Sequence, residues 1–396
     1  MTPSPALPRT VLALGVVSLL MDLSSETIHA LLPLFMANAL GLSMVAIGLL
    51  DGGAEALTLA IKPWAGKLSD RWQKRKPLAL AGYGLSALAK PLFAVAGGVA
   101  LIAGARFLDR LGKGIRGAPR DALIADVTPP EQRGAAYGLR QALDTVGALL
   151  APLLAAGLLW WLAGDYRAVF WLASLPAFAA VLLLWFAVRE PALHAHKSTT
   201  SSSAGDRHFG RPFWWVIGLA VLLTLARPGE AFLILRGQSV GLNDYQSALL
   251  LAAMNLSYAS SVWPVGRHFD RIGAPRLLTG SLFWLLLSQT CLALADGALL
   301  AYTGALLWGL HLGFSQGVLA ALIAQHAPRE RRGAAFGWYA LAVGVALLVN
   351  GSVFGALWQH RSASIAFTTT GALALLCLLS ALWWQQLRWR QQKRAP

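Results

Sequence analysis

The sequence predicts an all-α integral membrane protein with about twelve transmembrane helices, arranged as two six-helix bundles related by a pseudo-two-fold axis. Of its 396 residues, 56% are hydrophobic and only 13% are charged, whereas soluble domains carry about 25% charged residues. Apolar runs of about 20 residues, each long enough to cross a bilayer, recur along the whole chain. The connecting segments alternate between rich and poor in Lys and Arg. These observations exclude an ordinary soluble domain.

The apolar runs give the expected helices in chain order. In the first half they cover residues 11–38, 45–66, 77–96, 99–125, 133–158 and 166–187. In the second half they cover 213–235, 245–265, 274–294, 299–325, 332–355 and 363–387. Asp22 and Glu26 interrupt the first run and apolar sequence resumes after them, so it is expected to remain as a helix rather than to be a signal peptide.

The basic residues predict the topology. The segments that fall on one side of the membrane, together with both termini, hold most of the basic residues outside the helices, while the opposite segments hold Arg167, Arg236 and Arg361. The positive-inside rule therefore places both termini in the cytoplasm, and the compact loops suggest a bacterial inner membrane. This asymmetry accounts for the net charge of +15, so no nucleic-acid partner is expected.

The chain is an internal duplication. ALIADVTPPEQRGAAYG at 122–138 matches ALIAQHAPRERRGAAFG at 321–337, and GKLSDRW at 66–72 matches GRHFDRI at 266–272. Two matches at nearly one offset indicate parallel repeats of six helices. The Ser-, Thr- and His-rich stretch 189–212 reads as a cytoplasmic linker. The expected domains are 1–188 and 213–396.

The loop GKLSDRWQKRK at 66–76 resembles the signature G-x-L-x-D-R-x-G-R-K of the major facilitator superfamily. Gly66, Asp70, Arg71 and Arg75 match it, Gln73 stands where glycine is usual, and the second copy retains Gly266, Asp270 and Arg271. The resemblance implies a secondary transporter that works by alternating access. We expect Asp70 to pair with Arg133 or Arg332 and latch the cytoplasmic side.

The fifth run carries part of a second signature of that family. Gly138, Gly147 and Pro152 keep the spacing of its antiporter motif, while alanines stand at other positions where glycines are usual. The resemblance implies efflux by antiport. Close packing of small residues between membrane helices is the alternative reading.

The fourth run is unusually charged for a membrane helix. On a helix, Arg106, Arg110, Lys113 and Arg120 share one stripe, and Asp109, Arg116 and Asp121 lie at its edges. A charge facing lipid costs at least about 2.5–3.5 kcal/mol, so this face should line a polar interior. In the family that the chain resembles, the first, fourth, seventh and tenth helices line the central cavity.

Acids and bases on the other helices supply partners for this face. The first run carries Asp22, Glu26 and His29, the second Asp51 and Glu55, the third Lys90 and the fifth Asp144. Buried charges must be paired, so acids on helices one, two and five should meet bases on helices three and four. A purely structural ion-pair lattice is the alternative. The second half offers fewer such groups, chiefly Arg227, Glu230 and His311.

These residues predict a secondary transporter that exchanges a small organic solute for protons and acts as a monomer in the lipid bilayer. Glu26 is the leading candidate proton carrier, with Asp22 next and Glu230 in the second half. The runner-up function is transport of an organic anion held by the basic face of the fourth helix. A membrane-embedded enzyme is a remote alternative. No cofactor, metal site or nucleotide-binding loop is expected, and Cys291 and Cys377 offer no disulfide framework.

Overall fold

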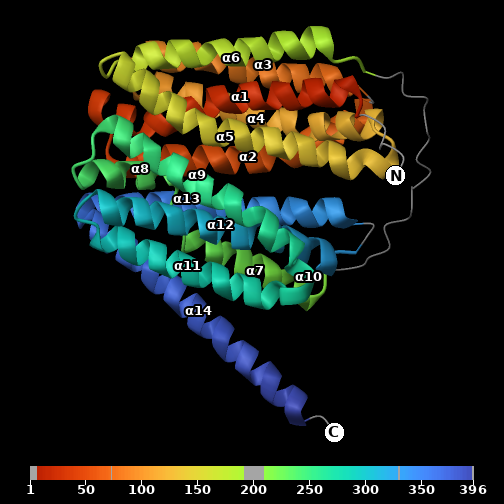
Figure 1. Ribbon diagram of the computed structural model, residues 1–396, viewed down its shortest axis with the longest axis vertical. Coiled ribbons are helices and arrows are strands. Elements are labelled where there is room, and N and C mark those ends of the chain that lie inside the picture. The colour runs from red at the N-terminus through yellow and green to blue at the C-terminus, as the bar shows by residue number, and fades with distance from the viewer. Residues whose placement is uncertain (1–6, 73, 191–208, 329–330, 395–396) are drawn as a thin grey trace. The chain divides into compact units, whose positions relative to one another are not determined.

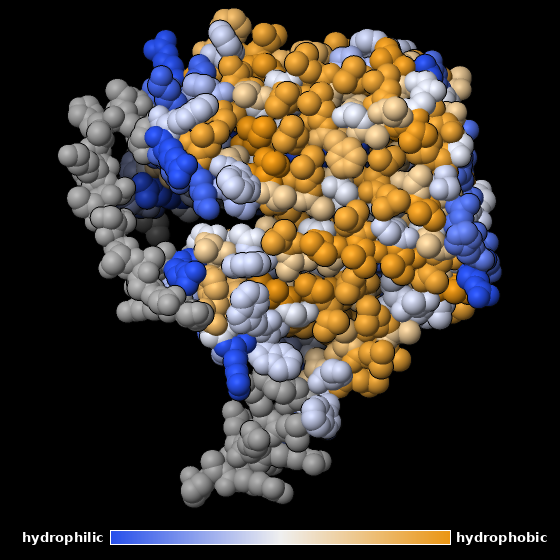
Figure 2. Space-filling model, turned by 180° about the vertical axis from the view of Figure 1, so that it is seen from behind, coloured by the Kyte–Doolittle hydropathy of each residue, from blue (hydrophilic) through white to orange (hydrophobic). Residues whose placement is uncertain are grey.

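The computed structural model describes residues 7–72, 74–190, 209–328 and 331–394, and within these ranges its regular structure is entirely helical. The expected all-α fold is confirmed. Eleven of its segments are long and apolar enough to cross a membrane. Figure 2 shows apolar residues over the middle of the visible face, with hydrophilic residues gathered at its left and right edges.

The described residues form two compact units. Residues up to 40 and from 53 to 190 make up the first, and residues 41–52 and from 209 onward make up the second. The first unit is built from α1 (Arg9–Leu34, continued by the π-helical turn Phe35–Ala39), α2 (Met44–Trp72, whose first residues group with the second unit), α3 (Arg75–Val95), α4 (Val99–Val127), α5 (Arg133–Trp161) and α6 (Tyr166–Ala187).

Helix α1 lies at the centre of the first unit, between α5 and α6, and α3 packs against α4 and α6 (Figure 1). An apolar cluster that includes Val17, Met21 and Tyr83 fills one end of this unit. Glycines allow α3 and α4 to approach closely: a methyl group at Gly82 would lie 2.6 Å from the backbone nitrogen of Arg116. This approach brings the charged face of α4 against its neighbours.

The second unit contains α7 (Arg211–Leu225), α8 (Glu230–Ser239), α9 (Asp244–Arg267), the short α10 (Phe269–Ile272), α11 (Ala274–Leu294), α12 (Ala298–His326), α13 (Arg332–His360) and α14 (Ala363–Arg394). Helix α12 packs against α9 and α11, and α11 also packs against α14. Helices α11, α12 and α13 correspond to α3, α4 and α5. Each begins and ends 199 residues after its counterpart. The duplication therefore extends to the lengths of these helices.

The seventh expected helix, 213–235, is not continuous. It is divided into α7 and α8 by the segment Ala226–Gly229. Pro228 has no backbone N–H to donate and disfavours a helical conformation in Arg227 before it. The side-chain amide of Asn350 donates to the carbonyl oxygens of Thr224, at 2.9 Å, and of Arg227, which satisfies acceptors that the break leaves open.

Helix α4 is the segment that hydropathy alone does not place in the membrane, because its charges lower its mean hydropathy. It has 29 residues, more than the ~20 that a bilayer requires. Its neighbours α3 and α5 both qualify as spans. The charges of α4 are therefore the feature that must be explained.

Candidate functional site

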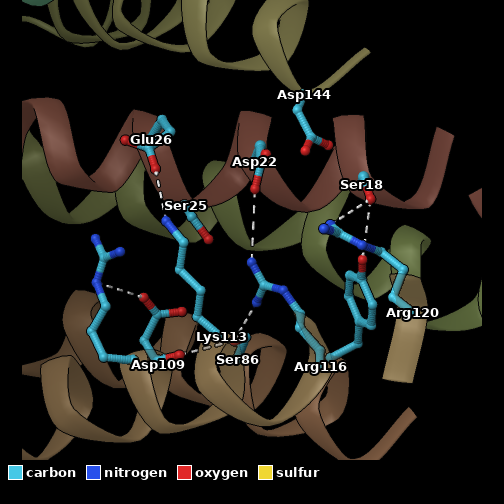
Figure 3. A network of polar contacts seen from close by, with 12 residues as sticks. Ser18, Asp22, Ser25, Glu26, Ser86, Asp109, Lys113, Arg116, Arg120 and Asp144 are labelled. Atoms are coloured by element: carbon cyan, nitrogen blue, oxygen red, sulfur yellow. Dashed lines mark hydrogen bonds and ion pairs between the residues drawn. The ribbon is translucent and has the colours of Figure 1, made fainter. Parts of the chain in front are cut away.

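The charged face of α4 forms a continuous lattice with α1, α2, α3 and α5 inside the first unit (Figure 3). Arg106, Asp109, Arg110 and Arg116 are all buried. Their burial agrees with the expectation that one polar face of this helix turns inward. The lattice has a tight inner part and a looser outer part.

The shortest ion pair of the lattice joins α3 to α4. The Nζ atom of Lys90 lies 2.7 Å from Oδ1 of Asp109, and the two side chains are 1% and 4% exposed. Lys90 also donates to Oγ of Ser25 on α1, at 2.8 Å. A buried charge pair is costly unless further hydrogen bonds satisfy it, and Ser25 supplies one of them.

A second group surrounds Glu55 of α2, whose side chain is 33% exposed although its arginine partners are buried. Its Oε1 atom lies 3.0 Å from Nη1 of Arg110 and 3.9 Å from Nη2 of Arg106. Nη2 of Arg106 also donates to Nδ1 of His29 at 3.1 Å. A guanidinium has no lone pair to offer, so Nδ1 of His29 is the acceptor and carries no proton in this arrangement.

The two acids of α1 make longer contacts. Oε1 of Glu26 lies 3.7 Å from Nζ of Lys113, and Oδ1 of Asp22 lies 3.7 Å from Nη2 of Arg116. Both acidic side chains are 20% exposed, and Lys113 is 36% exposed. These are the outer pairs of the lattice, and Figure 3 shows Lys113 and Arg116 directed at α1.

Hydroxyl groups connect the pairs. Arg116 donates to Oγ of Ser86 at 2.6 Å, and its guanidinium carbon lies 4.9 Å from the centre of the Tyr83 ring. Arg120 donates to Oγ of Ser18 at 2.9 Å and forms an ion pair with Asp121 at 3.1 Å. Each arginine of this part of α4 is therefore fixed by a neutral partner as well as an acid.

Helix α5 extends the lattice at one edge. Nη1 of Arg140 lies 2.9 Å from Oδ2 of Asp144 and 3.7 Å from Oδ1 of Asp121. Asp144 also acts electrostatically on Asp22, and Figure 3 shows it directed from α5 toward α1. The acids of α1, α4 and α5 thus share one electrostatic environment.

The expected pairing is correct for Asp22, Glu26 and Glu55, which all meet bases of α4. It is wrong for two groups. Lys90 pairs with Asp109 of the adjacent α4 rather than with an acid of α1, and Asp144 pairs with Arg140, one turn earlier on its own helix. In both cases a nearer partner is present: Asp109 on the adjacent helix for Lys90, and Arg140 on the same helix for Asp144.

Sequence reasoning missed the hydroxyls that hold the lattice, namely Ser18, Ser25, Ser86 and Tyr83. A signal was present, because Ser18, Asp22 and Ser25 recur every three or four residues and share one face of α1. Serine is common in membrane helices and often donates to its own backbone, so this signal is weak.

The loop after α2 forms a local cluster. Nη1 of Arg75 lies 2.7 Å from Oδ1 of Asp70, and its Nε lies 3.4 Å from Oδ2 of Asp126 at the end of α4. Glu190 accepts from the backbone nitrogen of Arg75.

Among the described side chains, Asp70 is paired with Arg75 rather than with the expected Arg133. Arg133 donates instead to the carbonyl oxygen of Thr128, at 3.4 Å. Gly66 faces α4, where a methyl group would lie 3.5 Å from Cβ of Ala118, while Arg71 and Arg271 are exposed. The side chains of Asp270 and Arg332 lie outside the described part of the chain.

The small residues of α5 separate into two kinds. A methyl group at Gly147 would lie 3.0 Å from the carbonyl oxygen of Leu19 and 3.3 Å from Cβ of Asp22, so this glycine sets the approach of α5 to α1. Pro152 is buried. A methyl group at Gly138 would meet nothing within 4 Å.

The second unit holds a smaller polar group near the break between α7 and α8. Glu230 begins α8 and interacts electrostatically with Arg227, and Arg227 also acts on His311. His311 is buried, with Nδ1 lying 2.8 Å from Oγ and 3.0 Å from the carbonyl oxygen of Ser281. Asp51 of α2 approaches the start of α8, because a methyl group at Gly229 would lie 3.0 Å from its Oδ2.

Nothing in the described ranges brings three or more His, Cys, Asp or Glu side chains together as metal ligands. What the first unit does provide is a set of ion pairs with graded exposure. Such a set can exchange a proton or a charged solute at its outer members while its inner members hold the helices together.

A profile described as Major Facilitator Superfamily matches residues 14–235 and 230–395. The chain belongs to the Major Facilitator Superfamily. It is a transporter of this type, embedded in a membrane, and its superfamily implies a small-molecule substrate.

Relatives from a bacterium and an archaeon match almost the whole length of this chain. An uncharacterized protein of Mycobacterium tuberculosis is 28% identical over 378 residues, covering 94% of this chain and 91% of the relative. An uncharacterized MFS-type transporter of Methanocaldococcus jannaschii is 28% identical over 380 residues, covering 93% of each. A crystal structure of a mutant peptide transporter, POT, has a TM-score of 0.80 at 15% identity, covering 95% of this chain and 94% of that one, which supports the fold alone.

Proposed function

We propose that this transporter is a proton-coupled antiporter that exports a small organic solute, with Glu26 and Asp22 as proton carriers. The observation that supports this proposal most directly is the grading of the lattice. Asp109 is almost fully buried and 2.7 Å from Lys90, whereas Glu26 and Asp22 are partly exposed and 3.7 Å from their partners. A carboxylate that must gain and lose a proton needs a weak, accessible ion pair, and the pairs of Glu26 and Asp22 are of this kind.

In the proposed cycle, protonation of Glu26 removes the charge that Lys113 faces. Lys113 is then left near Asp22 and Arg116, so the charge distribution between α1 and α4 changes. A solute that competes with the proton for the outer acids would be released when the proton binds. This competition is the elementary requirement of antiport, since the two ligands must not occupy the site together.

Export rather than import is supported by residues of α5. The spacing of Gly138, Gly147 and Pro152 resembles the family's antiporter motif, and Gly147 places α5 against Asp22. We propose that both termini are cytoplasmic and that the protein works as a monomer in the inner membrane of a bacterium. Under this proposal the lattice belongs to the translocation pathway and no covalent chemistry is required.

The test is transport in proteoliposomes under an imposed pH gradient, with ethidium, chloramphenicol and fluorescein as a cationic, a neutral and an anionic probe. Glu26→Gln, which mimics the protonated form, is expected to lower pH-driven transport at least tenfold while probe binding persists. Asp22→Asn is expected to have a similar or smaller effect. Glu230→Gln is the control from the second unit, and it should retain most of the transport.

If Glu26→Gln stays fully driven by pH while Glu230→Gln fails, the proton path lies in the second unit. If all three variants remain active, the lattice is structural and the driving ion is not the proton. Either result would refute the assignment of the proton carriers.

Organic-anion transport is the second candidate, supported by Lys113. It is the most exposed base in the lattice's ion pairs, and its contact with Glu26 is long enough for an anion to replace that acid. Transport of fluorescein, but not of ethidium or chloramphenicol, together with its loss in Lys113→Gln, would favour this function over the first.

A further inference from the structure

Each unit carries an exposed tryptophan that is covered by a basic side chain near the end of a helix. In α2, Nζ of Lys67 lies 5.8 Å from the centre of the Trp64 ring. In α9, the guanidinium carbon of Arg267 lies 5.4 Å from the centre of the Trp263 ring. Trp64 is 73% exposed and Trp263 is 67% exposed.

The duplication makes this arrangement more than a chance contact. Lys67 and Arg267 occupy the same position of the repeat, immediately after Gly66 and Gly266 of the loop signature. The tryptophans do not occupy the same position, because one lies three residues before its base and the other four. Residues three and four apart are neighbours on a helix, so two different sequence spacings produce the same pair.

Neither base is paired with an acid whose side chain the structure describes. Within the described part of the chain, Lys67 and Arg267 have no carboxylate at ion-pair distance, although nearly every base of the buried lattice has one. Both are exposed, as are Arg71 and Arg271 one turn further along. The exposed side of each pair therefore offers positive charge that no described carboxylate neutralises.

The exposed rings indicate what surrounds these bases. Tryptophan concentrates at the headgroup level of a bilayer, where its ring lies against lipid and its N–H meets polar groups. A base that lies over such a ring is held at the same depth, with its apolar stem against the acyl chains. The anion available at this depth is the phosphate of a lipid headgroup, and anionic headgroups attract each nearby Lys or Arg by about 1 kcal/mol.

We propose that the Trp64–Lys67 and Trp263–Arg267 pairs are two binding sites for anionic phospholipid headgroups, one in each repeat. The base contacts the phosphate and the indole ring lies against the glycerol and upper acyl chain. The topology expected from the positive-inside rule puts both pairs at the cytoplasmic leaflet, whose surface carries anionic lipid. These sites are independent of which solute is transported and of whether protons drive it.

The experiment is native mass spectrometry of the purified full-length protein, titrated with phosphatidylglycerol or with phosphatidylcholine of the same acyl chains. The wild type is expected to retain two phosphatidylglycerol molecules in preference to phosphatidylcholine. Lys67→Gln and Arg267→Gln should each weaken binding of one of them about fivefold, and the double variant should lose the preference. The conservative variant Lys67→Arg, which keeps the positive charge, should retain the preference for phosphatidylglycerol.

The control is Lys62→Gln with Arg276→Gln, which removes the same charge from one exposed residue of α2 and one of α11. This control is expected to keep both lipids. Equal loss in the control would show that net charge alone attracts the lipid, and equal binding of the two lipids by the wild type would show that no site exists. Both results overturn the proposal. Thermal unfolding of every variant separates lost binding from lost folding.

Discussion

The Lys90–Asp109 pair shows how one close ion pair can stabilise charged side chains inside a membrane protein. Both side chains are almost completely buried, and Ser25 satisfies a further proton of the ammonium group. Removing one partner leaves the other charged and unpaired in a medium that solvates it poorly. The pair is therefore required for folding whether or not it takes part in transport.

We predict that Lys90→Met lowers the free energy of unfolding by about 3–5 kcal/mol, because it removes the close partner of Asp109 and leaves this buried acid with a long contact to Arg110, at 3.9 Å. Lys113→Met, which breaks an exposed pair, should cost about 1 kcal/mol or less. Thermal unfolding in detergent measures both. The double variant Lys90→Met/Asp109→Asn should be more stable than either single variant. If Lys90→Met unfolds at the wild-type temperature, the pair contributes no stability.

Loop residues follow a different rule, because water already solvates them. The side chain of Asp70 is 72% exposed, although Arg75 lies only 2.7 Å away. We predict that Asp70→Asn leaves the unfolding temperature within about 1 °C of the wild type, since exposed pairs contribute little. The rate of transport should fall, because the loop cluster links α2 and α3 to the end of α4. Normal transport by Asp70→Asn would remove any gating role for this loop.

At the scale of elements, the contact between α1 and α5 determines where the outer acids lie. Gly147 leaves no room for a side chain beside Leu19 and Asp22, whereas Gly138 of the same motif faces open space. The shared motif therefore contains two glycines with different physical roles. Only one of them holds a helix near the lattice.

We predict that Gly147→Val destabilises the protein by about 1–3 kcal/mol, the usual cost of overpacking. It should also reduce transport, because α5 must move away from Asp22. Gly138→Val is the matched control and should leave the unfolding temperature nearly unchanged. Thermal unfolding and probe transport are the measurements. Equal stability of the two variants would show that α5 does not depend on this close approach.

Sequence reasoning predicted the helices well, because runs of apolar residues and basic loops report directly on the membrane. It failed at the seventh span, where Pro228 and Gly229 break the helix although the run stays apolar enough to read as continuous. That break depends on Asn350, more than 120 residues away, which satisfies the freed carbonyl groups. No local pattern reveals so distant a partner.

For the site, the sequence predicted which face of α4 is polar but not how its charges are shared. Helical spacing put Arg110 and Arg116 on the inward side, and both are buried. It did not identify Arg110 as the close partner of Glu55, or separate the tight Lys90 contact from the long Lys113 contact. Those distinctions depend on distances between helices, which the sequence does not contain.

At the scale of the whole molecule, the two repeats share their helices but not their buried charges. Helices α3, α4 and α5 have counterparts of equal length in α11, α12 and α13. At the repeat offset of 199, however, Gln289 stands where Lys90 does and Trp308 where Asp109 does, and both are buried. The second unit can therefore form the same bundle without ions. The ionic lattice of the first unit is therefore not required to form a bundle of this kind.

The membrane topology gives the last prediction. If both termini are cytoplasmic, the segment between α4 and α5 faces the cytoplasm and the segment between α11 and α12 faces outward. Glu131 and Asp296 are exposed residues in these two segments. In a variant whose Cys291 and Cys377 are replaced by alanine, a membrane-impermeant maleimide applied to intact cells should label Asp296→Cys. It should label Glu131→Cys only after the cells are permeabilised. The reverse pattern would invert the membrane orientation, place the basic loops outside, and refute the topology expected from the positive-inside rule.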